Sequence, residues 1–504
     1  MGNSPHTASI HILDDDSLLN MFCLYRPDFL SEETDHSWSL TGGIQKWVRG
    51  RWWYKLAHVC QRWRILILGS ASYLRLSLVC TNGTPVANML AHSPPIPLTV
   101  DYRGKDGITG EDEEGLMLAL EQRDRVRHLR LSFRAWDLEN LVMAIDREFP
   151  ILEYLIVVPP TQDSTALMLR KTLQAPHLRH LALTGFTCPI GPRLHPTAVG
   201  LVALDLVIDH PSAYFQPNIL LQWISFLPQL ETLAIAFTFH VPDRDVERQL
   251  THTPITTLIT LPNLRLFRFR GVNAYLEAIV CQITTPRLEK LHVKFFEQLT
   301  FSIPRLVQFM NTTENFRFDS AVFDFFIKRV CVGTYLRETN VYAFSIAVLC
   351  WHFDWQVSSV AQISNALSQV LSAVKHLNLR HKTHTRSSEE HNDIDHIQWR
   401  KLLRSFNNVK TLDVDDGLVK ELSRCLRLED GELPLELLPE LQELTYPRSG
   451  DTSDAFASFI EARRNAGRPV TLIRHSPRPS LSESHFEAPV LTLASSEAGN
   501  VVKT

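Results

Sequence analysis

The sequence lacks several features that mark whole classes of protein. No apolar run approaches the roughly 20 residues that a membrane-spanning helix needs. The eight cysteines among 504 residues form no Cys-x-x-Cys pair, which favours a reducing compartment, cytoplasmic or nuclear, over a disulfide scaffold. With 51 Lys and Arg against 55 Asp and Glu, the chain has no bulk positive charge that would hold nucleic acid. The N-terminus has neither the basic nor the apolar segment of a secretory signal.

Signatures of catalysis and of cofactor binding are also missing. The chain contains no Gly-x-Gly-x-x-Gly, no Walker loop, no Gly-x-Ser-x-Gly and no His-Glu-x-x-His. The pair Asp415-Asp416 has no base or metal partner beside it, so we interpret it as a solvated turn. Four histidines near carboxylates could bind zinc, but their spacing matches no structural site and indicates a solvated loop between repeats: His381, His384, His391 and His396. We expect no enzyme, no cofactor and no metal.

Two helical segments are predicted near the N-terminus. Asp14 and its neighbours precede the apolar run 18–22, as residues that cap a helix do. The segment 31–50 contains Gly42-Gly43 and mixed charges and indicates an inserted loop. A second, amphipathic helix is predicted from apolar residues at helical spacing: Leu56, Val59, Cys60, Trp63 and Ile67. Basic and aromatic residues over 46–55 could stack on nucleic acid, but we interpret them as anchoring the inserted loop on this helix.

A short phrase, apolar-x-x-apolar-x-apolar, recurs from about residue 109 onward and fades between 300 and 370. Its fourth position falls first at Leu129, Leu155, Leu181, Leu204, Leu233, Phe267 and Leu291, at spacings of 23 to 34 residues. This is roughly the 20–29-residue period of leucine-rich repeats, with insertions. Helical stretches such as 138–149 and 218–227 lie between phrases, and one strand with one helix must stack on its neighbours. The fold class we predict is α/β: a small N-terminal helical part followed by a leucine-rich-repeat-like solenoid.

Positions three and five of the phrase alternate away from the buried pair and should line the open face of the strands. We expect this concave face to bind a target protein through residues at these positions: His128, Arg130, Tyr154, His180, Asp205, Arg268, Lys290 and His292. Their mixed sign and shape suit a protein better than nucleic acid or a membrane surface.

The N-terminal residues also resemble a known domain. The run Leu13-Asp-Asp-Asp-Ser-Leu-Leu-Asn-Met-Phe22 and, after an insertion, Leu56-Ala-His-Val-Cys-Gln-Arg-Trp63 together resemble the F-box of the large fungal F-box family. The family pattern is Leu-Pro, a helix ending in Ile-Phe, and then Val-Cys-x-x-Trp. The resemblance covers about residues 11 to 100. This chain departs from it at Asp14, where the family usually has Pro, and in the insertion that splits the box.

The resemblance implies docking on a Skp-type adaptor of a cullin–RING ubiquitin ligase, by apolar anchors in a groove. The residues at the apolar positions of the box are Leu13, Leu18, Leu19, Met21, Phe22, Val59, Cys60 and Trp63. The repeats would then hold the target for ubiquitin transfer. The alternative is a leucine-rich-repeat interaction scaffold without a ligase link.

These observations divide the chain into five parts. We expect a flexible tail at 1–10, an F-box-like helical domain at 11–70 with its loop at 31–50, a connecting segment at 71–105, the solenoid at 106–475 and a disordered tail, rich in Ser and Pro, at 476–504.

Overall fold

The structure is a computed structural model that describes residues 13–25, 52–104, 108–133, 147–158, 167–168, 174–187, 199–238, 258–296, 298, 300–313, 315–316, 318–339, 341–382, 396–427, 435–447 and 455–475. Several expectations lie outside the described residues: the tails at 1–10 and 476–504, the loop at 31–50 and most of the predicted helix at 138–149.

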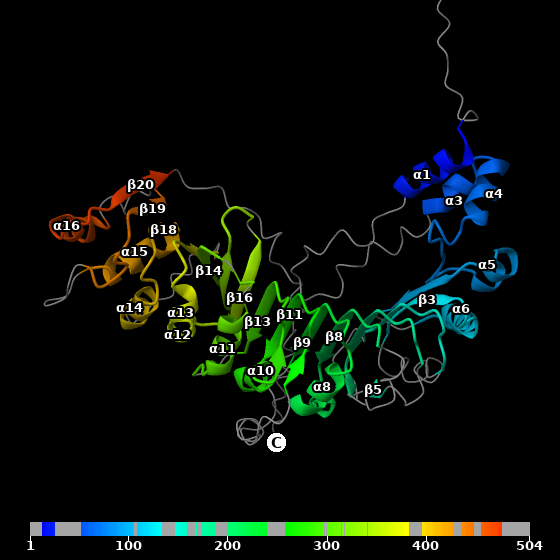
Figure 1. Ribbon diagram of the computed structural model, residues 1–504, viewed down its shortest axis with the longest axis horizontal. Coiled ribbons are helices and arrows are strands. Elements are labelled where there is room, and N and C mark those ends of the chain that lie inside the picture. The colour runs from blue at the N-terminus through cyan, green and yellow to red at the C-terminus, as the bar shows by residue number, and fades with distance from the viewer. Residues whose placement is uncertain are drawn as a thin grey trace, which may run out of the picture.

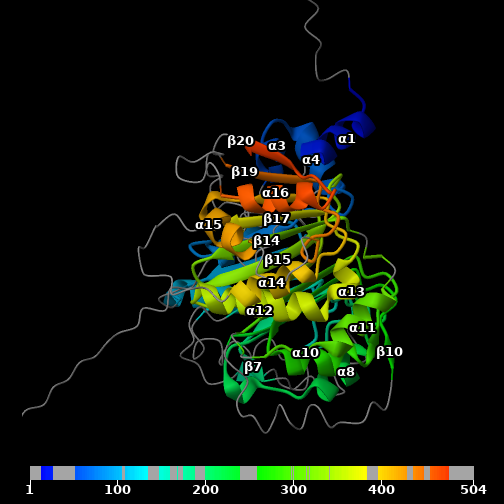
Figure 2. The ribbon, with the colours of Figure 1, turned by 90° about the vertical axis from the view of Figure 1, so that its left-hand side faces the viewer.

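The described elements form an arc, with the strands along its inner side and most helices along its outer side (Figure 1). A sheet of 16 described strands runs through the whole arc, in the order β1-β2-β3-β4-β6-β8-β9-β11-β13-β16-β15-β14-β17-β18-β19-β20. The predicted α/β leucine-rich-repeat-like solenoid is therefore confirmed as an architecture. Seen from one end, the strands stack above one another as successive rungs (Figure 2).

The strands of the main sheet are β1 (Leu78–Thr81), β2 (Leu98–Arg103), β3 (Val126–Ser132), β4 (Tyr154–Val157), β6 (His180–Thr184), β8 (Ala203–Ile208), β9 (Thr232–Phe237), β11 (Leu266–Gly271), β13 (Lys290–Phe295), β14 (Ser320–Phe326), β15 (Arg329–Tyr335), β16 (Tyr342–Leu349), β17 (His376–His381), β18 (Thr411–Val414), β19 (Glu443–Pro447) and β20 (Thr471–His475). Two small parallel ladders join β5 (Leu167–Met168) to β7 (Phe186–Thr187) and β10 (Ile259–Thr260) to β12 (Ile283–Thr284).

The described helices are α1 (Asp15–Tyr25), α3 (Trp52–Ala57), α4 (Gln61–Gly69), α5 (Val86–His92), α6 (Gly110–Glu121), α8 (Pro217–Ile224), α10 (Asn273–Val280), α11 (Pro304–Thr312), α12 (Phe353–Ala366), α13 (Ser368–Leu371), α14 (His396–Arg404), α15 (Asp416–Cys425) and α16 (Ala457–Asn465), with a 3-10 turn, η3 (Pro211–Ala213). Proline opens α8 and α11, where its missing N–H is not needed. The pair Asp415-Asp416 is not a solvated turn as predicted: Asp415 caps α15 by accepting from the backbone N–H of Asp416.

The repeat phrase sets the register of the sheet. Leu129, Leu155, Leu181 and Leu204 lie beside one another on four successive strands, and all four are buried. The sixth positions are buried on the same side, so each strand contributes two apolar side chains to the layer beneath the helices. Burial of such side chains contributes about 1.5–3 kcal/mol each relative to exposure, which is why the copies stack.

The sheet begins earlier than the sequence suggested. Strands β1 and β2 pair in parallel with Leu78 beside Leu98, inside the segment 71–105 that we expected to connect the two parts. The signal in the sequence was that apolar and polar residues alternate over 98–103. The apolar members Leu98, Val100 and Tyr102 are buried. The main sheet therefore begins at Leu78, within that segment.

Where the phrase fades, the strands change direction. Strands β14, β15 and β16 form an antiparallel set within the otherwise parallel sheet. The chain passes from β13 to β14, doubles back through β15 and β16, and places β16 beside β13 and β14 beside β17. A two-residue connection, Ile327-Lys328, makes the first reversal. Hairpin pairing replaces the strand-plus-helix unit here, which explains why the repeat spacing disappears.

Candidate functional site

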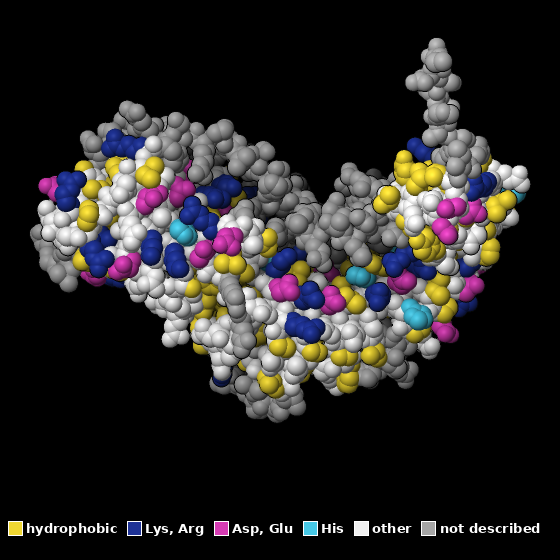
Figure 3. Space-filling view, turned by 45° about the horizontal axis from the view of Figure 1, so that its top comes forward, with side chains coloured by type: hydrophobic (Ala, Val, Ile, Leu, Met, Phe, Trp, Pro, Cys, Tyr) yellow, Lys and Arg dark blue, Asp and Glu magenta, His cyan; other side chains and the backbone are white. Residues whose placement is uncertain are grey.

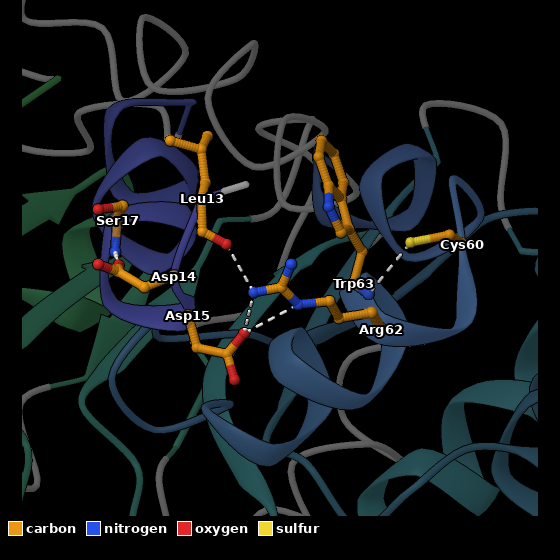
Figure 4. Close-up of polar contacts among 7 residues, drawn as sticks. All are labelled: Leu13, Asp14, Asp15, Ser17, Cys60, Arg62 and Trp63. Atoms are coloured by element: carbon orange, nitrogen blue, oxygen red, sulfur yellow. Dashed lines mark hydrogen bonds and ion pairs between the residues drawn. The ribbon is translucent and has the colours of Figure 1, made fainter. Parts of the chain in front are cut away.

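The N-terminal helical unit, by which we mean α1, α3, α4 and residues 70–76, lies at one end of the arc (Figure 1). Its first helix begins directly after Asp14, whose Oδ1 accepts a hydrogen bond from the backbone N–H of Ser17 at 2.6 Å (Figure 4). This hydrogen bond lowers the pKa of Asp14. Asp14 therefore caps α1. It stands at the position where the F-box family usually has Pro, a residue that also favours the start of a helix.

Arg62 fastens α1 to α4 (Figure 4). Its guanidinium donates to the backbone carbonyl of Leu13 at 2.7 Å and to the Asp15 carboxylate at 2.7 and 3.0 Å. Both hydrogen bonds to the carboxylate end on the same oxygen, Oδ1, and together with the bond to the Leu13 carbonyl they tie the start of α1 to α4. Sequence reasoning missed this contact, because no local pattern relates residue 62 to residue 15.

The core of the helical unit contains three of the eight residues predicted to bind an adaptor. Leu18, Phe22 and Trp63 are buried. The rings of Phe22 and Trp63 meet edge to face, with centroids 4.9 Å apart and planes at 67°. Leu13, Leu19 and Cys60 are partly buried against this core, and Met21 is also partly buried. Val59 is 58% exposed.

The predicted second helix is broken. Helix α3 ends at Ala57, and α4 begins at Gln61 after Cys60, whose backbone is extended with φ −157°. The Cys60 Sγ accepts from the backbone N–H of Trp63 at 3.5 Å and so caps α4. The spacing of apolar residues from Leu56 to Ile67 therefore spans two helices. No proline or glycine marks the break, which is why periodicity alone did not reveal it.

Apolar side chains lie on the surface of the helical unit, where Figure 3 shows them gathered near one end of the molecule. We call this set the apolar shell: Leu24, Tyr25, Val59, Ile65 and Tyr73, each more than half exposed. Of these, the sequence analysis named Val59 alone. Gathered surface apolar side chains mark sites where another protein can bind.

Packing and a hydrogen bond join the unit to the solenoid. The indole Nε1 of Trp53 donates to the carbonyl of Ser77 at 3.2 Å, and Leu74 and Leu76 are buried immediately before β1. The apolar core continues from the unit into the first strands. The helical unit therefore has a defined position relative to the sheet.

On the concave face, three of the predicted target-binding residues form a stack across neighbouring strands. His128, Tyr154 and His180 are register partners on β3, β4 and β6. The His128 and Tyr154 rings meet edge to face at 4.7 Å, and the Tyr154 and His180 rings stack at 4.1 Å with planes at 4°. Thr99 extends the row, with its Oγ1 3.1 Å from His128 Nδ1. We call this set the aromatic ladder.

The other predicted residues lie further along the same face. Arg268 is the register partner of His292, whose Nδ1 is 2.7 Å from Ser345 Oγ. Burial raises the pKa of Asp205 to about 6, against the opposing charge of Arg268. Lys290 is half-buried, whereas Arg130 is only 6% exposed and offers little surface to a partner. Figure 3 shows Lys, Arg, Asp, Glu and His side chains together along the hollowed face.

Of the four histidines weighed as a zinc site, His381 ends β17 and His396 begins α14, while His384 and His391 lie outside the described residues. Among the residues that the structure describes, no group of three or more His, Cys, Asp or Glu side chains is placed to hold a metal ion. Nor does any helix in the described ranges have the length and apolar character needed to cross a membrane.

Comparisons with known proteins add little. No family model and no curated protein matches the chain. Among solved structures, six chains match. One is the leucine-rich repeat-containing protein LegL7 from Legionella pneumophila, with 12% sequence identity and a TM-score of 0.26 over 79% of this chain and 99% of that one. A TM-score this low does not establish a shared fold, so the architecture rests on the sheet described above.

Proposed function

We propose that this protein is a substrate-recognition subunit of a Skp–cullin–F-box-type ubiquitin ligase. The helical unit would dock on the Skp-type adaptor, and the concave face would hold a target protein. The observation that carries the proposal is a helical unit whose sequence resembles an F-box, capped by Asp14 and tied by Arg62, at the end of a repeat arc.

The arrangement suits such a task physically. Transfer of ubiquitin requires a target held at a fixed place relative to the ligase, which is an orientation effect. The Trp53–Ser77 hydrogen bond and the continuous core hold the helical unit against the sheet. With the unit packed against the sheet in this way, one end of the molecule would bind the ligase while the concave face presents the target.

The roles of the predicted adaptor residues then divide. Leu18, Phe22 and Trp63 hold the helical unit together, because they are buried in its core. The apolar shell, which includes Val59 and Ile65, would make the contact with the adaptor. Apolar anchors that enter a groove on the partner give most of the binding free energy at such interfaces.

Co-purification tests this division. The full chain should retain a Skp-type adaptor and a cullin. The double variant Val59→Asp/Ile65→Asp should lose both while staying folded, because the two side chains are 58% and 64% exposed. A matched control is Ile219→Asp, since Ile219 is 45% exposed on α8, away from the helical unit. A wild-type chain that retains no adaptor would refute the ligase link.

The second candidate is a leucine-rich-repeat interaction scaffold without a ligase link. Two observations favour it: no family model matches the chain, and a break replaces the single helix expected over residues 56 to 67. This candidate predicts that the Val59→Asp/Ile65→Asp variant keeps every partner of the wild type. Loss of the adaptor and cullin alone, with other partners kept, would reject it.

A further inference from the structure

A hollow lies in the concave face where the regular repeats meet the antiparallel strands. It is formed by strands β11, β13, β16, β15 and β14. The walls include Arg268, Lys294, Arg329 and Tyr342. The repeat phrase does not predict this hollow, because β15 and β16 reach it only where the chain reverses direction.

Small residues explain why the sheet is hollow at this point. Gly333, Ser345 and Ala347 lie on the two middle strands and line the hollow. Gly333 has no room for a side chain, since a Cβ there would come within 2.5 Å of the Tyr342 ring. Longer side chains on the flanking strands, and Arg329 and Tyr342 at the ends of β15 and β16, therefore stand around a floor of short ones.

The charge around this floor is mostly positive. Arg268, Lys294 and Arg329 line the hollow together with the carboxylate of Asp324, and Asp205 lies within electrostatic range of Arg268. Asp324 is buried, and burial raises its pKa although Arg380, Lys382 and Arg329 oppose this shift. Arg270 adds a further cation as the register partner of Lys294. Its guanidinium lies 5.8 Å from the Phe296 ring, and its Nε has no hydrogen-bond partner among the described residues.

The pKa of Lys294 is lowered to about 8, mainly by burial and secondarily by the neighbouring cations Arg270 and Arg329. Among the described groups that act on it, the Cys331 thiol alone opposes the shift, and burial keeps that thiol neutral by raising its pKa to about 11. A lysine with a strongly lowered pKa beside two arginines marks a place where a bound anion would be favourable.

We propose that this hollow binds an oxyanion, a phosphoryl or carboxylate group, carried by the protein that the concave face holds. The proposal rests on the proposed function in one respect, that the concave face is where the target binds. It goes further because it states that an acidic or phosphorylated segment of the target binds at the strands where the repeat pattern is interrupted. Planar guanidinium groups and an ammonium group match the oxygens of either anion.

The reactivity of the Lys294 amine gives a direct test on the isolated full chain. The amines are acetylated briefly at pH 8 with inorganic phosphate, with acetate or with chloride at equal ionic strength, and the modified lysines are read by mass spectrometry. A bound anion would return the pKa of Lys294 toward about 10.4 and reduce its reactive fraction by up to about 100-fold at saturation. Protection by phosphate alone would assign a phosphoryl group, and protection by acetate as well would assign a carboxylate.

Lys290 is the internal control, because it lies on the same strand and the same face as Lys294 but outside the hollow. Its acetylation should not change with the anion. Equal protection of Lys290 and Lys294, or no protection of Lys294, would overturn the proposal. The variant Ala347→Leu fills the floor without removing a charge, and Arg329→Gln removes a charge without filling it. Each should abolish the protection of Lys294 in folded protein, and protection that survives both would also overturn the proposal.

This test separates the two proposals. Protection of Lys294 in a chain that retains no adaptor would support the oxyanion site and refute the ligase link. A chain that retains the adaptor but shows no protection would leave the ligase link standing and refute the oxyanion site.

Discussion

The aromatic ladder shows how single residues on the concave face are shaped by their neighbours. Burial lowers the pKa of His128 to about 3 and of His180 to about 4, and the charges of Arg127 and Arg179 act in the same direction. Both imidazoles are therefore neutral in the folded protein near pH 7. Neutral rings stack on Tyr154 without the cost of burying a charge, so the ladder is a surface for neutral or aromatic contacts.

The ladder should make the folded protein less stable as the pH is lowered. An unfolded histidine takes up a proton near pH 6.5, whereas His128 and His180 resist it in the folded state, so the unfolded chain binds more protons below pH 6.5. We expect the free energy of unfolding to drop as the pH falls from about 6.5 toward 4, by up to about 1 kcal/mol per pH unit for each histidine. Denaturant unfolding at several pH values measures this.

Variants isolate the contribution of the ladder. His128→Gln and His180→Gln should each flatten the dependence, and His92→Gln, at an exposed position on α5, should not. The comparison between variants is needed because the raised pKa of Asp205 acts in the opposite sense between about pH 6 and 4. Parallel curves for all variants would show that the ladder histidines titrate like those of an unfolded chain.

At the scale of elements, a buried arginine joins two C-terminal repeats. Arg400 on α14 is 6% exposed, and its guanidinium donates to the carbonyl of Cys425 at 3.1 Å and to that of Arg427 at 2.5 Å. These carbonyls lie at and just beyond the C-terminal end of α15, where backbone acceptors have no partner within the helix. The side chain of one repeat thus satisfies the helix end of the next.

Removing that guanidinium should loosen α15. We expect Arg400→Met to cost about 2–4 kcal/mol, because hydrogen bonds from a charged group contribute about 1.5–3 kcal/mol and the carbonyls would be left unsatisfied. Hydrogen exchange of residues 416–427 should rise in the variant. Lys401→Met is the matched control, since Lys401 is exposed on the same helix and its loss should stay within about 0.5 kcal/mol. Unchanged exchange in Arg400→Met would show that water replaces the guanidinium.

At the scale of the whole molecule, the arc is built from units that touch mainly their neighbours. Sheet pairing runs from each strand to the next, and the helical unit adjoins the first strand through buried Leu74 and Leu76 and the Trp53–Ser77 hydrogen bond. In such an arrangement, damage at one end need not spread to the other. The proposed ligase end and target face should therefore be separable.

Trp63→Ala tests that separation. Truncating a buried aromatic residue costs about 3–5 kcal/mol, a large share of the stability of a small unit. We expect α1 and α4 to lose protection from hydrogen exchange and the adaptor to be lost, while β4 to β20 keep their protection and the target stays bound. Trp63→Phe, which keeps an aromatic ring against Phe22, should be milder. A rise in exchange along the whole sheet would mean that the helical unit and the solenoid unfold as one.

The sequence predicted the parts of the fold that depend on local spacing. Alternation of side chains in a strand is a local property, so the phrase identified the buried Leu129 and Leu155 and placed His128 and Tyr154 together on the opposite face. It did not reveal the break at Cys60, because an extended residue between two helices leaves the apolar spacing intact.

What the sequence by itself determined is the repeating strand, its buried side and its open side, since these follow from period and from the stacking that each unit needs. The tertiary structure alone decided how distant segments meet. It placed Arg62 on Asp15, set β16 beside β13 and β14 beside β17, and so gathered Lys294, Arg329 and the short side chains of β15 and β16 around one hollow. These contacts join residues far apart in the chain, and no local period encodes which of them become neighbours.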